Sequence, residues 1–187
     1  MLLPRDHSAG AAWEVLAIVS ATIRAGPASM WHLTVYSLPI VDQGAMIMEA
    51  DILEALGGSS VFGKRRRIDL MEEVERGLPT KSYKVIAAAL GLRPGEEDKL
   101  LGVSARTRAR WAGKARIDPA TSDRIMRLAR IFALATDVLG SREAAVEWLR
   151  EPTEYLGGRS PLEALATDVG AEKVTNMLYQ MEYGVFA

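Results

Sequence analysis

The chain has 187 residues, of which 49% are hydrophobic and 25% charged, so it can bury a core as one domain or two small ones. It has no cysteine, and its only histidines are His7 and His32. Disulfides, zinc fingers and thiol nucleophiles are therefore excluded, as is a histidine general base in the C-terminal half. The net charge of −1 hides an uneven distribution: residues 63–140 carry +7, whereas residues 1–62 and 141–187 each carry −4. A basic middle between acidic flanks indicates a polyanionic partner for the middle alone.

Residues 1–45 form an N-terminal extension whose status stays open. They contain three prolines and no sustained hydrophobic period, and Met46 and Met48 directly precede a good helical pattern. The extension is either part of the protein or the product of an upstream start codon. The apolar segment 15–23 is too short to span a bilayer, and its flanks make a poor signal peptide, so we expect a cytoplasmic protein with no membrane partner.

From Met46 onward, glycines, prolines and capping residues divide the chain into short helices, so the predicted fold class is all-α. Asp118 and Pro119 are expected to begin the longest helix, with the aspartate as N-cap and the proline at the first helical position. Ser104, Ser141 and Ser160 are expected to cap three others. The predicted helices span residues 47–56, 68–76, 81–90, 96–101, 105–113, 118–139, 142–149, a short turn after 160, and 171–183.

Residues 96–111 read EEDKLLGVSARTRARW, which is typical of a helix-turn-helix. Gly102 permits the positive φ of the turn, and the second helix of such a motif enters the major groove of DNA. Arginine can bind guanine through two hydrogen bonds, and hydroxyl groups at a helix N-terminus can bind phosphate. The candidates for contact with bases or nearby phosphates are therefore Ser104, Arg106, Thr107 and Arg110. The candidates for added positive charge along the DNA backbone are Arg108, Lys114 and Arg116.

Two positions depart from the usual helix-turn-helix pattern. Asp98 stands where a small residue usually packs, and Arg108 stands where an aliphatic side chain usually points inward. Leu101, Val103 and Trp111 are left as packing residues. The alternative interpretation of the motif is a solvated basic helix within an ordinary bundle.

Four segments in order resemble the Xre/MbcA/ParS antitoxin family, and the resemblance covers residues 46–187. They are GLPTKSYKVIAAALGL, LGVSARTRARW, SDRIMRLARIFALATDVLG and the C-terminal run from AVEWLREPTEYLGGRSPLEAL to MEYGVFA. The resemblance implies an Xre-like domain over 46–140 that binds its own promoter as a homodimer, and a toxin-binding domain over 141–187. It also implies that the partner toxin has a RES domain that consumes NAD, that the antitoxin's C-terminal end covers the toxin's NAD pocket, and that the chain has no catalytic role. No metal or cofactor is expected, since the sequence has no cysteine and both histidines lie far from the C-terminal half.

The pattern of residues 141–187 predicts three short helices with little hydrophobic core of their own. Such a module should expose apolar surface that a partner protein can cover. The tail from Tyr183 is apolar and aromatic, and is a candidate plug; the alternative is that Tyr183 and Phe186 fold back on the core. Trp148 and Leu149 are expected in the core. The candidate toxin-binding residues are Tyr155, Arg159, Tyr183, Gly184, Val185, Phe186 and Ala187.

Three functions compete. The first is an antitoxin that also represses its own operon. The second is a plain helix-turn-helix regulator whose C-terminal module binds another protein. The third, an enzyme, is disfavoured because the sequence has no paired carboxylates at catalytic spacing, no phosphate-binding glycine loop and no cysteine.

Overall fold

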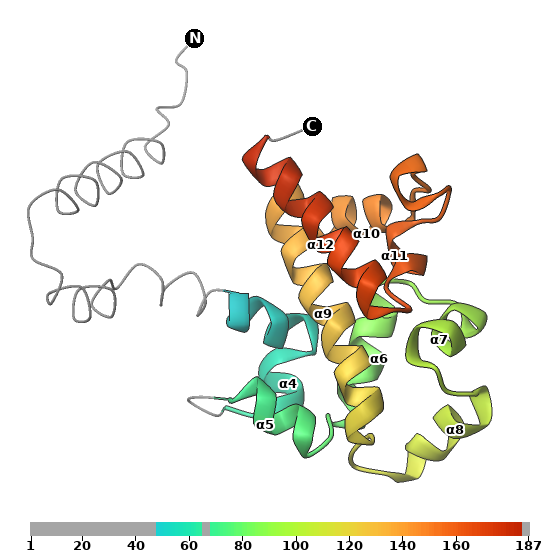
Figure 1. The fold of residues 1–187 in the computed structure, drawn as a ribbon. Helices are drawn as coiled ribbons and strands as arrows, with labels where there is room; N and C mark the ends of the chain where they lie inside the picture. The colour runs from blue at the N-terminus through green and yellow to red at the C-terminus, as the bar shows by residue number, and fades with distance from the viewer. Residues whose placement is uncertain (1–47, 65–67, 185–187) are drawn as a thin grey trace, which may run out of the picture. The chain divides into compact units, whose positions relative to one another are not determined.

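The computed structural model describes residues 48–64 and 68–184, and over these ranges it is built from helices with no strand. This confirms the all-α prediction. Residues 48–55 are helical, and eleven shorter or longer helices follow in chain order (Figure 1). They are α4 Gly58–Phe62, α5 Leu70–Glu75, α6 Thr80–Ala89, α7 Pro94–Leu101, α8 Ala105–Ala109, the 3₁₀ turn η3 Arg110–Gly113, α9 Pro119–Leu139, α10 Arg142–Arg150, the 3₁₀ turn η4 Glu154–Leu156, α11 Pro161–Ala164 and α12 Asp168–Tyr183. Within the described ranges, no helix has the length and apolar character of a membrane span.

The predicted helix caps are confirmed. The Ser104, Ser141 and Ser160 hydroxyls each accept a hydrogen bond from the backbone N–H three residues later, at 3.3, 3.1 and 3.2 Å. The Asp118 carboxylate does the same for α9, at 2.9 Å from the Thr121 nitrogen. Because each cap satisfies an otherwise unpaired N–H of a first turn, these residues fix where the helices begin.

Two glycines act differently from the prediction. Gly57 has φ +105° and ends the first helical segment, but Gly58 then begins α4 instead of a loop, and α4 buries Phe62. Gly170 lies inside the first turn of α12, which begins at Asp168 and not at Ala171. A Cβ at position 170 would lie 1.9 Å from the carbonyl oxygen of Ala164, so glycine is there because α11 and α12 approach closely.

Helix α9 is the centre of the bundle. Helices α5, α6, α7, α10 and α12 all pack against it, and Figure 1 shows α10 and α12 lying along its C-terminal half. Its buried stripe includes Ile125, Leu128 and Phe132. The C-terminal helices add Ala145, Leu149, Val174 and Leu178 to the same continuous core. The C-terminal segment was predicted to have little core of its own. It packs on α9, so the C-terminal helices and the helix-turn-helix region share one hydrophobic interior.

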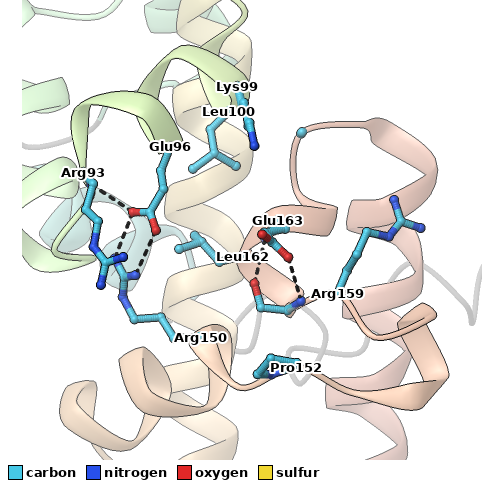
Figure 2. A pocket seen from close by; sticks show the side chains of 11 residues that line it. Arg93, Glu96, Lys99, Leu100, Arg150, Pro152, Arg159, Leu162 and Glu163 are labelled. Carbon is cyan, nitrogen blue, oxygen red and sulfur yellow. Dashed lines mark hydrogen bonds and ion pairs between the residues drawn. The ribbon is translucent and has the colours of Figure 1, made fainter.

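Arg150, the last residue of α10, ties the C-terminal helices to α6 and α7. Its guanidinium donates to both carboxylate oxygens of Glu96, at 3.2 and 3.3 Å (Figure 2). It also donates to the carbonyls of Leu90 and Gly91, at 2.8 and 2.6 Å. These carbonyls end α6, and Glu96 lies in the first turn of α7. One side chain of α10 therefore holds two consecutive helices, α6 and α7, that lie far from it in the sequence.

This ion pair predicts a pH-dependent stability. The hydrogen bonds from Arg150 hold the pKa of Glu96 below its ordinary value of 4.5. A lowered folded-state pKa stabilises the fold above the unfolded-state value, and that stabilisation is lost as pH falls through the folded value. We expect Glu96→Gln to be less stable than the wild type at pH 7, with the difference shrinking below pH 4.5. Urea unfolding across this range measures it, with Glu151→Gln, a change at an exposed neighbouring carboxylate, as control. A difference that is constant with pH would contradict the assignment.

Candidate functional site

The turn between α7 and α8 has the geometry of a helix-turn-helix. Gly102 adopts φ 62° and ψ 27°, a left-handed conformation that glycine adopts without strain. A Cβ there would lie 2.7 Å from a guanidinium nitrogen of Arg124, which donates to the Leu101 carbonyl at 2.7 Å. The second helix is α-helical only to Ala109 and then tightens into the 3₁₀ turn η3, where a continuous helix to Gly113 was predicted.

The outer face of α8 and η3 is cationic. Ser104, Arg106, Arg110 and Lys114 are exposed. Across residues 48–64 and 68–184, none of these three basic side chains forms an ion pair with a carboxylate. Thr107 is half-buried, and its backbone N–H and hydroxyl both face the Ser104 hydroxyl at 3.3 Å. The structure thus brings four of the predicted DNA contacts to one solvent-facing segment, with Thr107 fixing the start of the helix.

Arg108 has a different place from the one predicted. Its side chain is only 10% exposed and lies between α7 and α8, where it pairs with Glu97 at 3.0 Å and with Asp98. The two departures from the usual motif, Asp98 and Arg108, are therefore partners. A charged pair occupies the place where two helix-turn-helix helices usually meet through a small and an aliphatic residue. Its guanidinium is therefore engaged inside the motif and holds α8 against α7, and its predicted contact with the DNA backbone stays a prediction.

An aromatic pair supports this polar contact. The rings of Tyr83 on α6 and Trp111 on η3 meet edge to face at 5.2 Å. Burial raises the pKa of Tyr83, and its side-chain hydrogen bond with Glu97 raises it further. Glu97 is thus held between the Tyr83 hydroxyl and the Arg108 guanidinium. Helices α6 and α7 are thus linked to α8 and η3 from their inner side, which leaves the outer face exposed to a partner.

Removing Arg108 should cost stability. Arg108→Ala leaves Glu97 and Asp98 without their cation, and we expect a loss of about 2 kcal/mol, below the range for fully buried pairs because Asp98 is partly solvated. The double change Asp98→Ala with Arg108→Leu restores an apolar contact and should recover part of the loss, because Glu97 stays without its cation. Urea denaturation measures both. The double variant should also bind duplex DNA as the wild type does; if its affinity falls, Arg108 contacts DNA after all.

Arg116 is also engaged within the fold. Its guanidinium donates to the Glu73 carboxylate at 2.9 Å and to the Gly77 carbonyl, and its backbone forms an isolated bridge with Pro79. Glu73 is only 3% exposed, so Arg116 supplies charge to a buried carboxylate on α5. Arg116 therefore joins α5 to the segment before α9, and its predicted contact with a DNA phosphate stays a prediction.

A second surface lies on the C-terminal helices. Tyr155, Arg159, Tyr183 and Gly184 are all exposed, with Tyr155 at 59% and Tyr183 at 70%. The predicted residues Val185, Phe186 and Ala187 lie outside the described residues. Tyr183 does not fold back on the core. Leu149 is buried and Trp148 packs partly buried against the core, as predicted.

Helix α12 exposes apolar side chains besides the predicted toxin-binding residues. Val169 is 67% exposed, and Tyr179 is exposed with its ring centre 6.4 Å from that of Tyr183. The inner face carries Val174 and Leu178, so the outer residues follow the same helical spacing on the opposite side. This spacing was available in the sequence and could have identified Tyr179. Exposed aromatic residues on one helix face are typical of a protein-binding surface.

The fold and its two surfaces define a helix-turn-helix DNA-binding protein with a separate protein-binding face. Residues 69–130 match the family described as the antitoxin Xre-like helix-turn-helix domain. Residues 134–184 match the antitoxin Xre/MbcA/ParS C-terminal toxin-binding domain. Helix α9 crosses from one match into the other.

Several relatives are named Antitoxin Xre. One from Yersinia enterocolitica is 30% identical over 120 residues, which covers 63% of this chain and 81% of the relative. One from Photorhabdus laumondii is 28% identical over 60% of this chain and 77% of the relative. One from Pseudomonas putida is 40% identical over 34% of this chain and 40% of the relative. The chain belongs to the Xre antitoxin family, and is an antitoxin with a DNA-binding helix-turn-helix domain and a toxin-binding domain.

Proposed function

We propose that this antitoxin acts in the cytoplasm, where it neutralises a RES-domain, NAD-consuming toxin by covering its active site. The observation that carries the proposal is the exposed aromatic face of α12, with Tyr179 and Tyr183 in contact, inside the region that matches a toxin-binding domain. Tyrosine is enriched among the residues that contribute most to protein interfaces. The tail after Gly184 follows α12 in the sequence, and the family resemblance assigns it to the toxin's NAD pocket.

We also propose a division of labour along the chain. Residues 46–140 bind the operon's own promoter as a homodimer and repress it, and residues 141–187 bind the toxin. In this scheme Arg106 and Arg110 meet base edges, Ser104 meets a phosphate, and Lys114 adds charge along the DNA backbone. Their exposure, and the lack of carboxylate partners for the basic ones in the part of the chain that the structure describes, support these roles.

Co-expression tests the proposal. The reading frame next to this gene is expressed alone and together with the full antitoxin. Growth arrest by the neighbour alone, relieved by the antitoxin, is the expected result. A neighbour with no effect on growth, or arrest that the antitoxin does not relieve, would instead favour the plain regulator, whose C-terminal module binds some other protein.

A further inference from the structure

A cleft of about 510 Å³ lies between α7 and the segment that runs from the end of α10 through α11 (Figure 2). Arg93, Lys99 and Leu100 line one wall, within the helix-turn-helix match. Arg159 and Leu162 belong to the opposite wall, within the toxin-binding match. The lining ends at Ala166, two residues before α12, so along the chain the cleft adjoins the first turn of α12 with its exposed Val169.

The cleft carries unbalanced positive charge. Its lining holds four cations and two anions, namely Arg93, Lys99, Arg150, Arg159, Glu96 and Glu163. Both anions are already satisfied: Glu96 accepts from Arg150 and from the Arg93 backbone N–H at 2.9 Å, and Glu163 accepts from the Ser160 backbone N–H at 3.1 Å. Lys99 and Arg159 are exposed and have no carboxylate partner among the described residues. The cleft is therefore cationic, although residues 141–187 carry a net charge of −4.

The walls also contain apolar side chains, which helps to identify the occupant. Leu100, Leu162, Pro152 and Ala166 border the same space as the cations. A phosphodiester backbone would satisfy the cations but has no apolar group to place against these residues. A peptide in which aspartate or glutamate adjoins an aliphatic or aromatic side chain satisfies both, because its apolar group leaves water while its carboxylate meets Lys99 or Arg159.

We propose that this cleft binds an acidic, partly apolar segment of the toxin, so that the toxin's footprint extends from the C-terminal helices onto α7 of the helix-turn-helix domain. The inference rests on the proposed function, since it takes the toxin as partner. It adds a site for an acidic peptide whose lining does not include the α12 tyrosines. It also places part of the bound toxin beside the first helix of the DNA-binding motif.

Charge reversal tests the cleft. Binding of the full antitoxin to the purified product of the neighbouring gene is measured by calorimetry. Lys99→Glu and Arg159→Glu should each weaken binding about tenfold, and the double variant about a hundredfold. Lys99→Arg keeps the charge and should bind within about twofold of the wild type. Lys84→Glu, the same reversal at an exposed lysine of α6 outside the cleft lining, is the matched control and should bind like the wild type.

The chain has no cysteine, so Lys99→Cys gives a single attachment point for a thiol-directed photo-crosslinker. The crosslinked toxin peptide should be rich in aspartate or glutamate; a basic peptide, or no adduct in a formed complex, overturns the inference. The inference is also overturned if the double variant binds toxin as tightly as Lys84→Glu does. If the double variant keeps its affinity for toxin but loses affinity for duplex DNA, the cleft contacts DNA phosphates instead, which overturns the inference as well. A wild-type chain that binds no toxin overturns the proposed function and this inference together, whereas normal binding by the double variant overturns the inference alone.

Discussion

An antitoxin that ends at Glu182 should fail to protect cells from the toxin while keeping its fold. The truncation removes Tyr183, which is 70% exposed and contributes nothing to the core, together with the tail that the family resemblance places in the NAD pocket. Central aromatic residues of an interface contribute about 2–4 kcal/mol, which corresponds to a loss of about thirtyfold to a thousandfold in affinity. Growth of cells that co-express toxin and truncated antitoxin measures protection, and calorimetry measures the affinity.

The full-length variant Tyr179→Ala with Tyr183→Ala separates the α12 face from the tail. If the face binds the toxin, this variant also loses affinity, with an unchanged melting temperature because both side chains are exposed. Met71→Ala, which removes another exposed apolar side chain from α5, is the control and should protect fully. Full protection by the truncated chain would show that the tail does not cover the active site.

Arg106→Ala and Arg110→Ala should each weaken binding to the operator by about 1–3 kcal/mol and relax the preference at one base pair. Both side chains extend from the solvent-facing side of α8 and η3, which the Arg108 pair and the Tyr83–Trp111 contact hold against the bundle. Loss of a bidentate contact removes discrimination as well as affinity, because arginine reads guanine through two acceptors. Quantitative footprinting on the promoter and on single-base variants of it measures both effects.

Lys114→Ala is the matched comparison for these arginines. It should weaken binding to all sequences alike and lower the salt dependence by about one counterion, because a phosphate contact carries no sequence information. If none of the three substitutions changes the affinity for DNA, α8 and η3 are not part of the DNA interface.

Local signals predicted most of the fold. A capping serine or aspartate acts on an N–H three residues away, so Ser104, Asp118, Ser141 and Ser160 could be placed from the sequence alone. Gly170 could not, because the reason for it is the carbonyl of Ala164, which approaches only once α11 and α12 have packed. The packing of α5, α6 and α7 against the same helix α9 as α10 and α12 likewise depends on long-range contacts, which no short window of sequence contains.

The same difference between local and long-range signals applies to the residues of the two surfaces and the cleft. The exposed cations of the helix-turn-helix were identified because exposure follows from the helical period. The pairing of Asp98 with Arg108 could have been predicted, since two unusual residues of opposite charge stand at positions that meet in the motif. The pairing of Arg116 with Glu73 could not have been predicted, because Glu73 lies 43 residues earlier in the chain. The cleft beside Lys99 brings together residues from both family matches and exists only in the folded chain.

Titration of the toxin's NAD consumption with the purified, full-length antitoxin tests the central claim most directly. The product of the neighbouring gene is assayed for loss of NAD while antitoxin is added. If the C-terminal helices and tail cover the active site, activity should fall in proportion to the antitoxin added and vanish at a fixed molar ratio. Undiminished NAD consumption in the presence of excess folded antitoxin would contradict the claim.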